Sequence, residues 1–262
     1  MRATLTALWG EVRKGLLISW TYKANMLVSI LTLGFIFVGI AFFMGGGELD
    51  PERIASSLVG YLVWMYVVQA ISDLTYGLRG EISAGTLEQL EMSPAPAGLL
   101  LIGRVITNFT ITTLQVALMA TVMRLLFNVR VSWRLEALPA LLLTLVGVLG
   151  FGYLLAGTML VFKQVESFSN LMNNALAFLN GTFLPVSAMP GWLAGISMSL
   201  PSTLGIVVIR GILLEGKTLA DTWYEGSLGW LAVNAVLYLV VGIAVFWICE
   251  RAAKNRGSLG QY

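Results

Sequence analysis

The sequence predicts an all-α integral membrane protein with six membrane-spanning helices. Of its 262 residues, 57% are hydrophobic and only 11% are charged, whereas an ordinary soluble domain has roughly 25% charged residues. The mean hydropathy is +0.82, and so much apolar surface requires lipid as its solvent. One cysteine and no histidine exclude a disulfide framework, a thiolate zinc site and imidazole catalysis. The net charge of +2 is too small to indicate nucleic acid as a partner.

Six stretches without acidic or basic residues mark the expected spans. About 20 residues are needed to cross roughly 30 Å of hydrocarbon. Five stretches have this length, namely 24–47, 54–72, 105–123, 137–162 and 226–249. The remaining stretch, 167–209, is too long for one crossing and contains Pro185, Pro190 and Pro201. We therefore expect a helix over 167–184, followed by a broken segment.

The distribution of basic residues indicates which side of the membrane each end of the chain occupies. Basic residues are enriched at both ends of the chain: Arg2, Arg13, Lys14, Lys23, Arg251, Lys254 and Arg256. The positive-inside rule therefore places both termini in the cytoplasm of a plasma (inner) membrane protein. Residues 186–215 then form an outward-facing re-entrant hairpin between spans five and six. This topology turns Arg124, Arg130 and Arg134 outward, against the rule, and the sequence gives no physical account of them.

Two structural units follow from this pattern. Residues 1–23 are expected to form an amphipathic helix on the cytoplasmic membrane surface, and residues 24–262 a single transmembrane domain. The apolar residues of the first unit recur at helical spacing, with charges between them: Leu5, Leu8, Trp9, Val12 and Leu16.

Residues 211–218 match the phosphate-binding pattern G-x-x-x-x-G-K-[ST] letter for letter. A genuine phosphate loop lies between a strand and a helix and is followed later by an apolar strand that ends in Asp. The flanks here are membrane-type sequence, and the predicted topology places Lys217 outside the cell. We interpret the match as chance.

The segment 79–96, between spans two and three, has a distinct local pattern. Thr86 and Gln89 form a capping box, Gly85 permits a sharp entry, and Pro94 and Pro96 end the helix after about two turns. Leucines occupy one helix face and glutamates another, as suits docking into a groove with an apolar floor and a basic rim. The alternative interpretation is a solvated intracellular turn. The residues that carry the docking hypothesis are Glu81, Gly85, Thr86, Leu87, Glu88, Leu90, Glu91, Ser93 and Pro94.

Residues 81–94 resemble the coupling-helix segment of ABC-2 type export permeases, in which an acidic residue precedes a Gly-Thr-Leu-Glu-x-Leu run that ends in Ser or Thr and Pro. The resemblance extends over nearly the whole chain, from the surface helix through the six spans. It includes the family's outer re-entrant hairpin, through Pro185, Met189, Pro190, Trp192, Pro201 and Arg210.

The resemblance implies a permease subunit that has no ATPase site and binds no cofactor or metal. It further implies two cytosolic ABC ATPase subunits, which bind ATP and Mg, and a second permease chain in a homodimer or heterodimer. The expected substrate is an amphiphilic or hydrophobic compound such as a drug, a natural product or a lipid. Two alternatives remain open: export of a lipid-linked polysaccharide, and a membrane scaffold or sensor that transports nothing.

Two groups of polar and aromatic residues are candidates for the substrate path. Four asparagines fall within about a 120° arc of the fifth helix: Asn170, Asn173, Asn174 and Asn180. Span two contributes Tyr61, Trp64, Tyr66 and Gln69. Hydrogen bonding between helices is the alternative for the asparagines, and packing or interfacial anchoring for the second group. Arg210 is expected to pair with Glu215 or a lipid phosphate, and the sequence does not decide between them.

Overall fold

The computed structural model of the chain describes residues 2–83, 97–129, 131–132, 134–162 and 166–255. Every regular element in these ranges is helical. The long helices are α1 (Arg2–Thr21), α2 (Lys23–Met44), α3 (Pro51–Ser83), α5 (Ala97–Phe127), α6 (Ala137–Phe162) and α11 (Ser227–Asn255). The shorter elements are α7 (Glu166–Leu179), the 3₁₀ turn η1 (Val186–Ala188), α8 (Gly191–Ser199), α9 (Pro201–Leu213) and α10 (Leu219–Tyr224).

Among the described residues, five helices are long and apolar enough to cross a membrane. They are Lys23–Met44, Pro51–Asp73, Ile106–Phe127, Ala137–Thr158 and Ser227–Cys249, which confirms five of the six predicted spans. Helices α8 and α9 meet at a bend of 92° and bring the number to six if they count as one broken span.

The predicted helix over 167–184 was wrong in its end point, because α7 stops at Leu179. Its 14 residues extend about 21 Å at 1.5 Å per residue, less than the roughly 30 Å of hydrocarbon. The chain turns at Asn180 and Gly181, and Gly181 has a φ of 78°. The side-chain oxygen of Asn180 accepts a hydrogen bond of 3.1 Å from the backbone N–H of Thr182, and this local bond replaces further helix.

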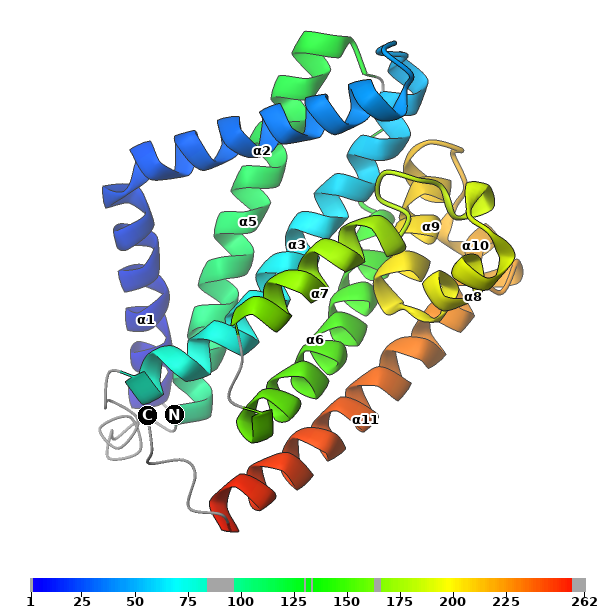
Figure 1. The fold of residues 1–262 in the computed structure, drawn as a ribbon. Coiled ribbons are helices and arrows are strands. Elements are labelled where there is room, and N and C mark those ends of the chain that lie inside the picture. The colour runs from blue at the N-terminus through cyan, green and yellow to red at the C-terminus, as the bar shows by residue number, and fades with distance from the viewer. Residues whose placement is uncertain (1, 84–96, 130, 133, 163–165, 256–262) are drawn as a thin grey trace.

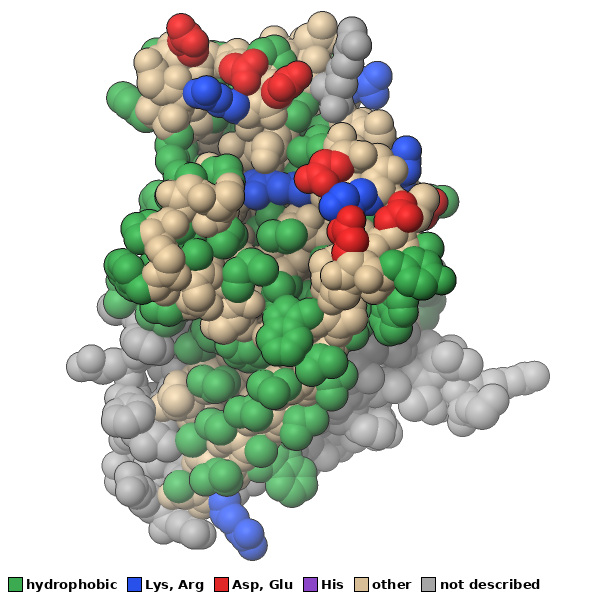
Figure 2. All heavy atoms as spheres, turned by 90° about the vertical axis from the view of Figure 1, so that its right-hand side faces the viewer, with side chains coloured by type: hydrophobic (Ala, Val, Ile, Leu, Met, Phe, Trp, Pro, Cys, Tyr) green, Lys and Arg blue, Asp and Glu red, His purple; other side chains and the backbone are tan. Residues whose placement is uncertain are grey.

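The start of α1 and the end of α11 lie at the same end of the bundle (Figure 1). Acidic and basic side chains gather at the opposite end, above a largely apolar surface (Figure 2). Helix α1 packs along α5, and α2 then crosses α5 obliquely (Figure 1). The placement of α1 on the membrane surface stays a prediction.

Helix α9 is the best-buried element of the described chain. Helices α3, α6 and α11 all pack against it, and its side chains are buried from Pro201 to Ile206 and again at Val208, Ile209 and Ile212. Its neighbours contribute Val63, Val67, Val148 and Leu231 to the same apolar cluster. The second arm of the predicted hairpin is therefore a helix buried among α3, α6 and α11.

Helices α6 and α11 pack backbone against backbone through a stripe of glycines. A Cβ atom at Gly150 would overlap the backbone of Tyr238 and Leu239, and one at Gly157 would lie 2.9 Å from the Cα of Phe246. Small residues allow such close approach, which compensates for the absence of a hydrophobic driving force between helices in lipid.

We expect Gly150→Ala to destabilise the protein by about 1–3 kcal/mol, because the added methyl group must push the two helices apart. The matched control is Gly229→Ala on α11, where a Cβ would meet nothing within 4 Å. Thermal unfolding of the purified variants in detergent measures the difference. Equal midpoints for the two variants would contradict the close packing.

Candidate functional site: a buried polar and aromatic cluster of α3, α7 and α9

Arg210, in the last turn of α9, ties three segments together. Its Nε donates to the carbonyl of Ser56 on α3 at 2.9 Å, and its Nη2 donates to the carbonyl of Thr182 at 3.0 Å. Gly60 makes room for the guanidinium, since a Cβ there would lie 2.7 Å from Nη2. The expected pairing of Arg210 with Glu215 was wrong, because backbone carbonyls bind this side chain and Glu215 pairs with Lys217 at 3.2 Å. The lipid-phosphate alternative stays a prediction.

The turn after α7 is held by side chains as well as by Arg210. The hydroxyl of Thr182 lies 2.6 Å from Asn180 Oδ1 and 3.4 Å from the carbonyl of Gly60. Asn180 is fully buried, with 0% of its surface exposed, and its Nδ2 has no partner within the described residues. Asn180 was predicted to line the substrate path. In the structure, its side-chain oxygen bonds Thr182 and holds the turn.

A row of aromatic rings lies beside this turn. Tyr61 packs at tilted angles against Phe37, Trp64 and Phe183, with ring centroids 5.0, 5.2 and 5.8 Å apart. Phe183 in turn contacts Phe178 of α7 at 6.0 Å. Tyr61 is only 1% exposed and donates its hydroxyl to the carbonyl of Leu33, so its environment is that of a packing residue.

The asparagines of α7 face different surroundings. Asn173 is buried, and its Oδ1 has no partner in the described part of the chain. Asn174 is exposed and lies between Leu171 and Phe178, which are 59% and 57% exposed. The backbone of Asn170 is helical, but its side chain lies outside the described set. The predicted polar arc is therefore divided between the interior and the surface of the subunit.

Gln69 belongs to a separate polar group nearer the other end of α3. Gln69 Nε2 and Asn108 Nδ2 both donate to Asp73 Oδ1, at 2.8 and 2.7 Å. Tyr66, one turn earlier, donates its hydroxyl to Thr113 of α5 at 3.0 Å. The bonds of Asn108 and Tyr66 join α3 to α5, as expected for polar side chains between membrane helices, whereas the bond from Gln69 lies within α3.

A cavity of about 610 Å³ opens at the charged end of the molecule. Its walls are the end of α2, the start of α3 and the segment from Phe183 to Pro185. Phe183 therefore joins the aromatic row to the cavity. The charged residues of the lining are Glu48, Asp50, Glu52 and Arg53.

The residues of the predicted outer hairpin lie in different environments and do not form one site. Pro185 lines the cavity, and Met189 is buried with its sulfur 3.3 Å from the hydroxyl of Ser197. Pro190 precedes α8, and Trp192 in its first turn is exposed. Pro201 begins α9 at a position where its missing N–H is not needed.

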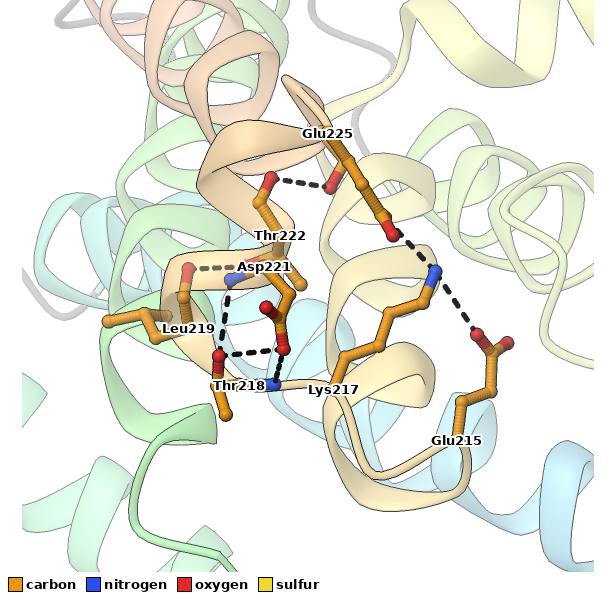
Figure 3. Close-up of polar contacts among 8 residues, drawn as sticks. Glu215, Lys217, Thr218, Leu219, Asp221, Thr222 and Glu225 are labelled. Carbon is orange, nitrogen blue, oxygen red and sulfur yellow. Dashed lines mark hydrogen bonds and ion pairs between the residues drawn. The ribbon is translucent and has the colours of Figure 1, made fainter.

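Residues 211–218, which match the phosphate-loop pattern, form the end of a helix and part of an ion cluster (Figure 3). The first three residues belong to α9 rather than to a loop after a strand. Lys217 Nζ lies 3.0 Å from Glu225 and 3.2 Å from Glu215, and its bonds to Glu225 and then Glu215 raise its pKa. Thr218 caps α10 through a reciprocal bond with Asp221, and the backbone and side-chain bonds from Thr218 lower the pKa of that carboxyl.

One of the three arginines that the predicted topology turns outward has a structural role. Arg134 Nη1 donates to the carbonyl of Gly216 at 3.0 Å, and nearby Glu136 accepts from the N–H of Leu219 at 3.3 Å. Both bonds join the α5–α6 connection to the segment before α10. Arg124 is exposed at the end of α5, and Arg130 lies outside the described residues.

The predicted coupling segment lies almost entirely outside the described residues. Glu81 falls in the last turn of α3, but its side chain is not described. The remaining members of the set, from Gly85 to Pro94, lie outside the described residues. Within the described residues, no group of three or more His, Cys, Asp or Glu is placed to hold a metal ion.

We expect Arg210→Lys to lower the stability of the fold by about 1.5–3 kcal/mol, the contribution of one hydrogen bond to a charged group. A lysine keeps the charge but lacks the planar fork that reaches Ser56 and Thr182 together. Thermal unfolding in detergent measures the loss, and Arg124→Lys at an exposed position is the control. A shift no larger than that of the control would show that the bonds of Arg210 do not hold these segments.

Comparison with known proteins agrees with this architecture. The family model described as ABC-2 type transporter matches residues 3–214, about four-fifths of the 262 residues. A search of curated proteins finds no match. The matched range contains the expected coupling segment 79–96, the turn after α7 and the whole of α9. The chain is therefore a member of the ABC-2 type transporter family, the membrane component of an ABC transporter.

Proposed function

We propose that this chain is the permease subunit of an ATP-driven exporter that moves an amphiphilic or hydrophobic compound out of the cytoplasm or the inner leaflet. The observation that carries the proposal is the family match over residues 3–214. Two cytosolic ABC ATPase subunits supply ATP hydrolysis with Mg, and a second permease chain completes the path. Both termini lie in the cytoplasm of the plasma (inner) membrane, so segment 79–96 meets the ATPases there.

The exposed face of α7 is the part of this subunit that we assign to the path. A polar side chain on a membrane helix is expected to face protein or water rather than lipid, and Asn174 is exposed in the single subunit. Leu171 and Phe178 share its face at helical spacing. Phe178 contacts Phe183, and Phe183 lines the cavity at the charged end of the molecule. In this way the exposed face of α7, which is apolar and aromatic apart from the amide of Asn174, leads through Phe183 to the cavity at the charged end. We take this cavity as the exit of the path.

We expect the double variant Glu88→Ala, Glu91→Ala to reduce ATP-dependent efflux at least tenfold, because removal of two carboxylates weakens docking to a basic rim on the ATPase. Transport by inside-out vesicles that carry the whole complex measures it. The matched control is Glu215→Ala, Glu225→Ala, which removes the same charge from the exposed ion cluster around Lys217, away from the lining of the cavity. Wild-type efflux by the first variant would contradict the assignment of this segment.

Copurification in mild detergent separates a transporter from a scaffold. We expect the wild-type permease to retain an ATPase subunit, identified by its mass and by ATP hydrolysis, and Leu87→Asp, Leu90→Asp to release it. The reason is that two buried carboxylates would replace the apolar contact. A stable permease that never retains an ATPase in several lipids would favour the scaffold or sensor.

We expect Asn174→Leu and Phe178→Ala each to lower efflux about three- to tenfold while ATPase binding is unchanged, because each removes about 1 kcal/mol of contact with the moving substrate. The control is Trp247→Ala, an exposed aromatic residue on α11. A loss that is equal in the control would mean that exposed apolar surface in general, and not this face, supports transport.

A further inference from the structure

Asp73 on α3 carries a negative charge that no cation among the described residues balances. Gln69 Nε2 and Asn108 Nδ2 both donate to its Oδ1, at 2.8 and 2.7 Å, and both of these amides are neutral. No lysine or arginine of the described chain forms an ion pair with Asp73. The carboxylate therefore has hydrogen bonds on one oxygen and no counter-charge.

The same arrangement leaves acceptor oxygens unused. A carboxylate only accepts hydrogen bonds, so each amide turns its NH₂ group toward Asp73 and keeps its own oxygen as an acceptor. Within the described part of the chain, Asp73 Oδ2, Gln69 Oε1 and Asn108 Oδ1 accept no hydrogen bond, and none of them is among the buried atoms that lack a partner. All three side chains are half-buried, so these oxygens remain open to a ligand.

The position of Asp73 along α3 places it far from the charged end of the molecule. Arg53 is exposed near the start of α3 and lines the cavity of that end. Asp73 follows Arg53 by 20 residues in one continuous helix, which is about 30 Å along the axis and about the thickness of the hydrocarbon. Helix α3 runs toward the end where α1 begins and α11 ends (Figure 1). A membrane whose hydrocarbon begins at Arg53 therefore ends near Asp73.

Hydrogen bonding between α3 and α5 does not by itself require a charge at this position. An asparagine at position 73 could accept the same two bonds through its side-chain oxygen. An ionised carboxylate at the hydrocarbon is costly unless it is paired, and such residues mark the paths of ions or substrates. The charge therefore points to a ligand that supplies a cation.

The unused groups indicate which kind of cation fits. The three acceptor oxygens equal in number the three N–H donors of a primary ammonium group, whereas a trimethylammonium group has no donor. Carbon surface lies beside them, because Phe109 follows Asn108 and packs against Tyr66 with ring centroids 5.3 Å apart. Tyr66, Gln69 and Asp73 share one face of α3 at helical spacing. A carboxylate, amide oxygens and an aromatic wall are thus neighbours.

From this arrangement we propose that Asp73, with the amide oxygens of Gln69 and Asn108, binds the primary ammonium group of an amphiphilic amine. The ammonium pairs with Asp73 Oδ2, and the apolar part of the compound lies against Phe109. This inference rests on the proposed function, and it names amphiphilic amines as the class of compound that the permease takes up at the end of the bundle where its termini lie.

Native mass spectrometry of the purified permease in a neutral detergent tests the proposal. The probes are hexadecylammonium, hexadecyltrimethylammonium and hexadecyl sulfate, and we expect retention to fall in that order. Asp73→Asn, which keeps an acceptor for both amides, should bind hexadecylammonium about tenfold more weakly, as expected for the loss of a hydrogen bond to a charged group. The control Glu136→Gln removes an exposed carboxylate but keeps the acceptor for Leu219, and it should bind hexadecylammonium as the wild type does.

The wild-type measurements alone can overturn the proposal, even if Asp73→Asn does not fold. Equal retention of hexadecylammonium and hexadecyl sulfate would exclude the carboxylate site, and equal retention of the two cations would exclude the hydrogen-bonded ammonium. Unchanged retention of hexadecylammonium in a folded Asp73→Asn variant would exclude Asp73.

Two further comparisons separate the sources of the amine and the two proposals. Retention of phosphatidylethanolamine over phosphatidylcholine of identical chains, lost in Asp73→Asn, would assign the ammonium to a membrane lipid and overturn its assignment to the exported compound. The binding assay contains no ATPase, so it does not depend on coupling. ATP-dependent efflux by the whole complex without amine binding by the permease would reject the amine and leave the proposed function standing.

Discussion

The turn after α7 is buried at Asn180 and Thr182, and a buried backbone carbonyl needs a hydrogen-bond donor in place of water. This constraint governs the broken half of the molecule. Helix α7 ends at Leu179, and the carbonyl of Thr182, just beyond it, accepts a hydrogen bond from a residue far along the sequence. The guanidinium of Arg210 donates to the carbonyls of Thr182 and Ser56. The arginine thus acts as an internal substitute for solvent, where a carboxylate partner would have brought a second charge out of water.

Satisfying the turn in this way fixes the surrounding architecture. Because Arg210 lies in the last turn of α9, its support of the turn depends on α9 being packed against α3, α6 and α11. The turn then sets Phe183 against Tyr61 and places Pro185 at the cavity of the charged end. The hydrogen bonds of Arg210 therefore support both the aromatic packing inside the subunit and the wall of the cavity at its charged end.

The spans could be predicted from sequence because lipid imposes both a length and an absence of charge on each of them. The end of α7 was missed, although Asn180-Gly181 is a strong turn signal, because the apolar stretch continues past it. Helix α10 was missed as well, and Thr218 with Asp221 three residues later was the available signal. The partners of Arg210 are backbone carbonyls, which every residue has, so no residue type could have indicated them. Phe178 and Phe183 were missed because an aromatic ring on a membrane helix reads alike whether it faces lipid, protein or a cavity.

The glycine contacts between α6 and α11 have a mechanical consequence. Two helices whose backbones touch cannot slide or tilt independently without separating, since no flexible side chains lie between them to adjust. At Gly242, a Cβ would overlap the backbone of Gly150, so the contact extends over several turns. Helix α2, by contrast, buries only Ile30, Gly34 and Phe37. The subunit therefore combines a stiff side, built on α6, α9 and α11, with a less tightly packed side at α2, and we expect the membrane to deform the protein mainly at α2.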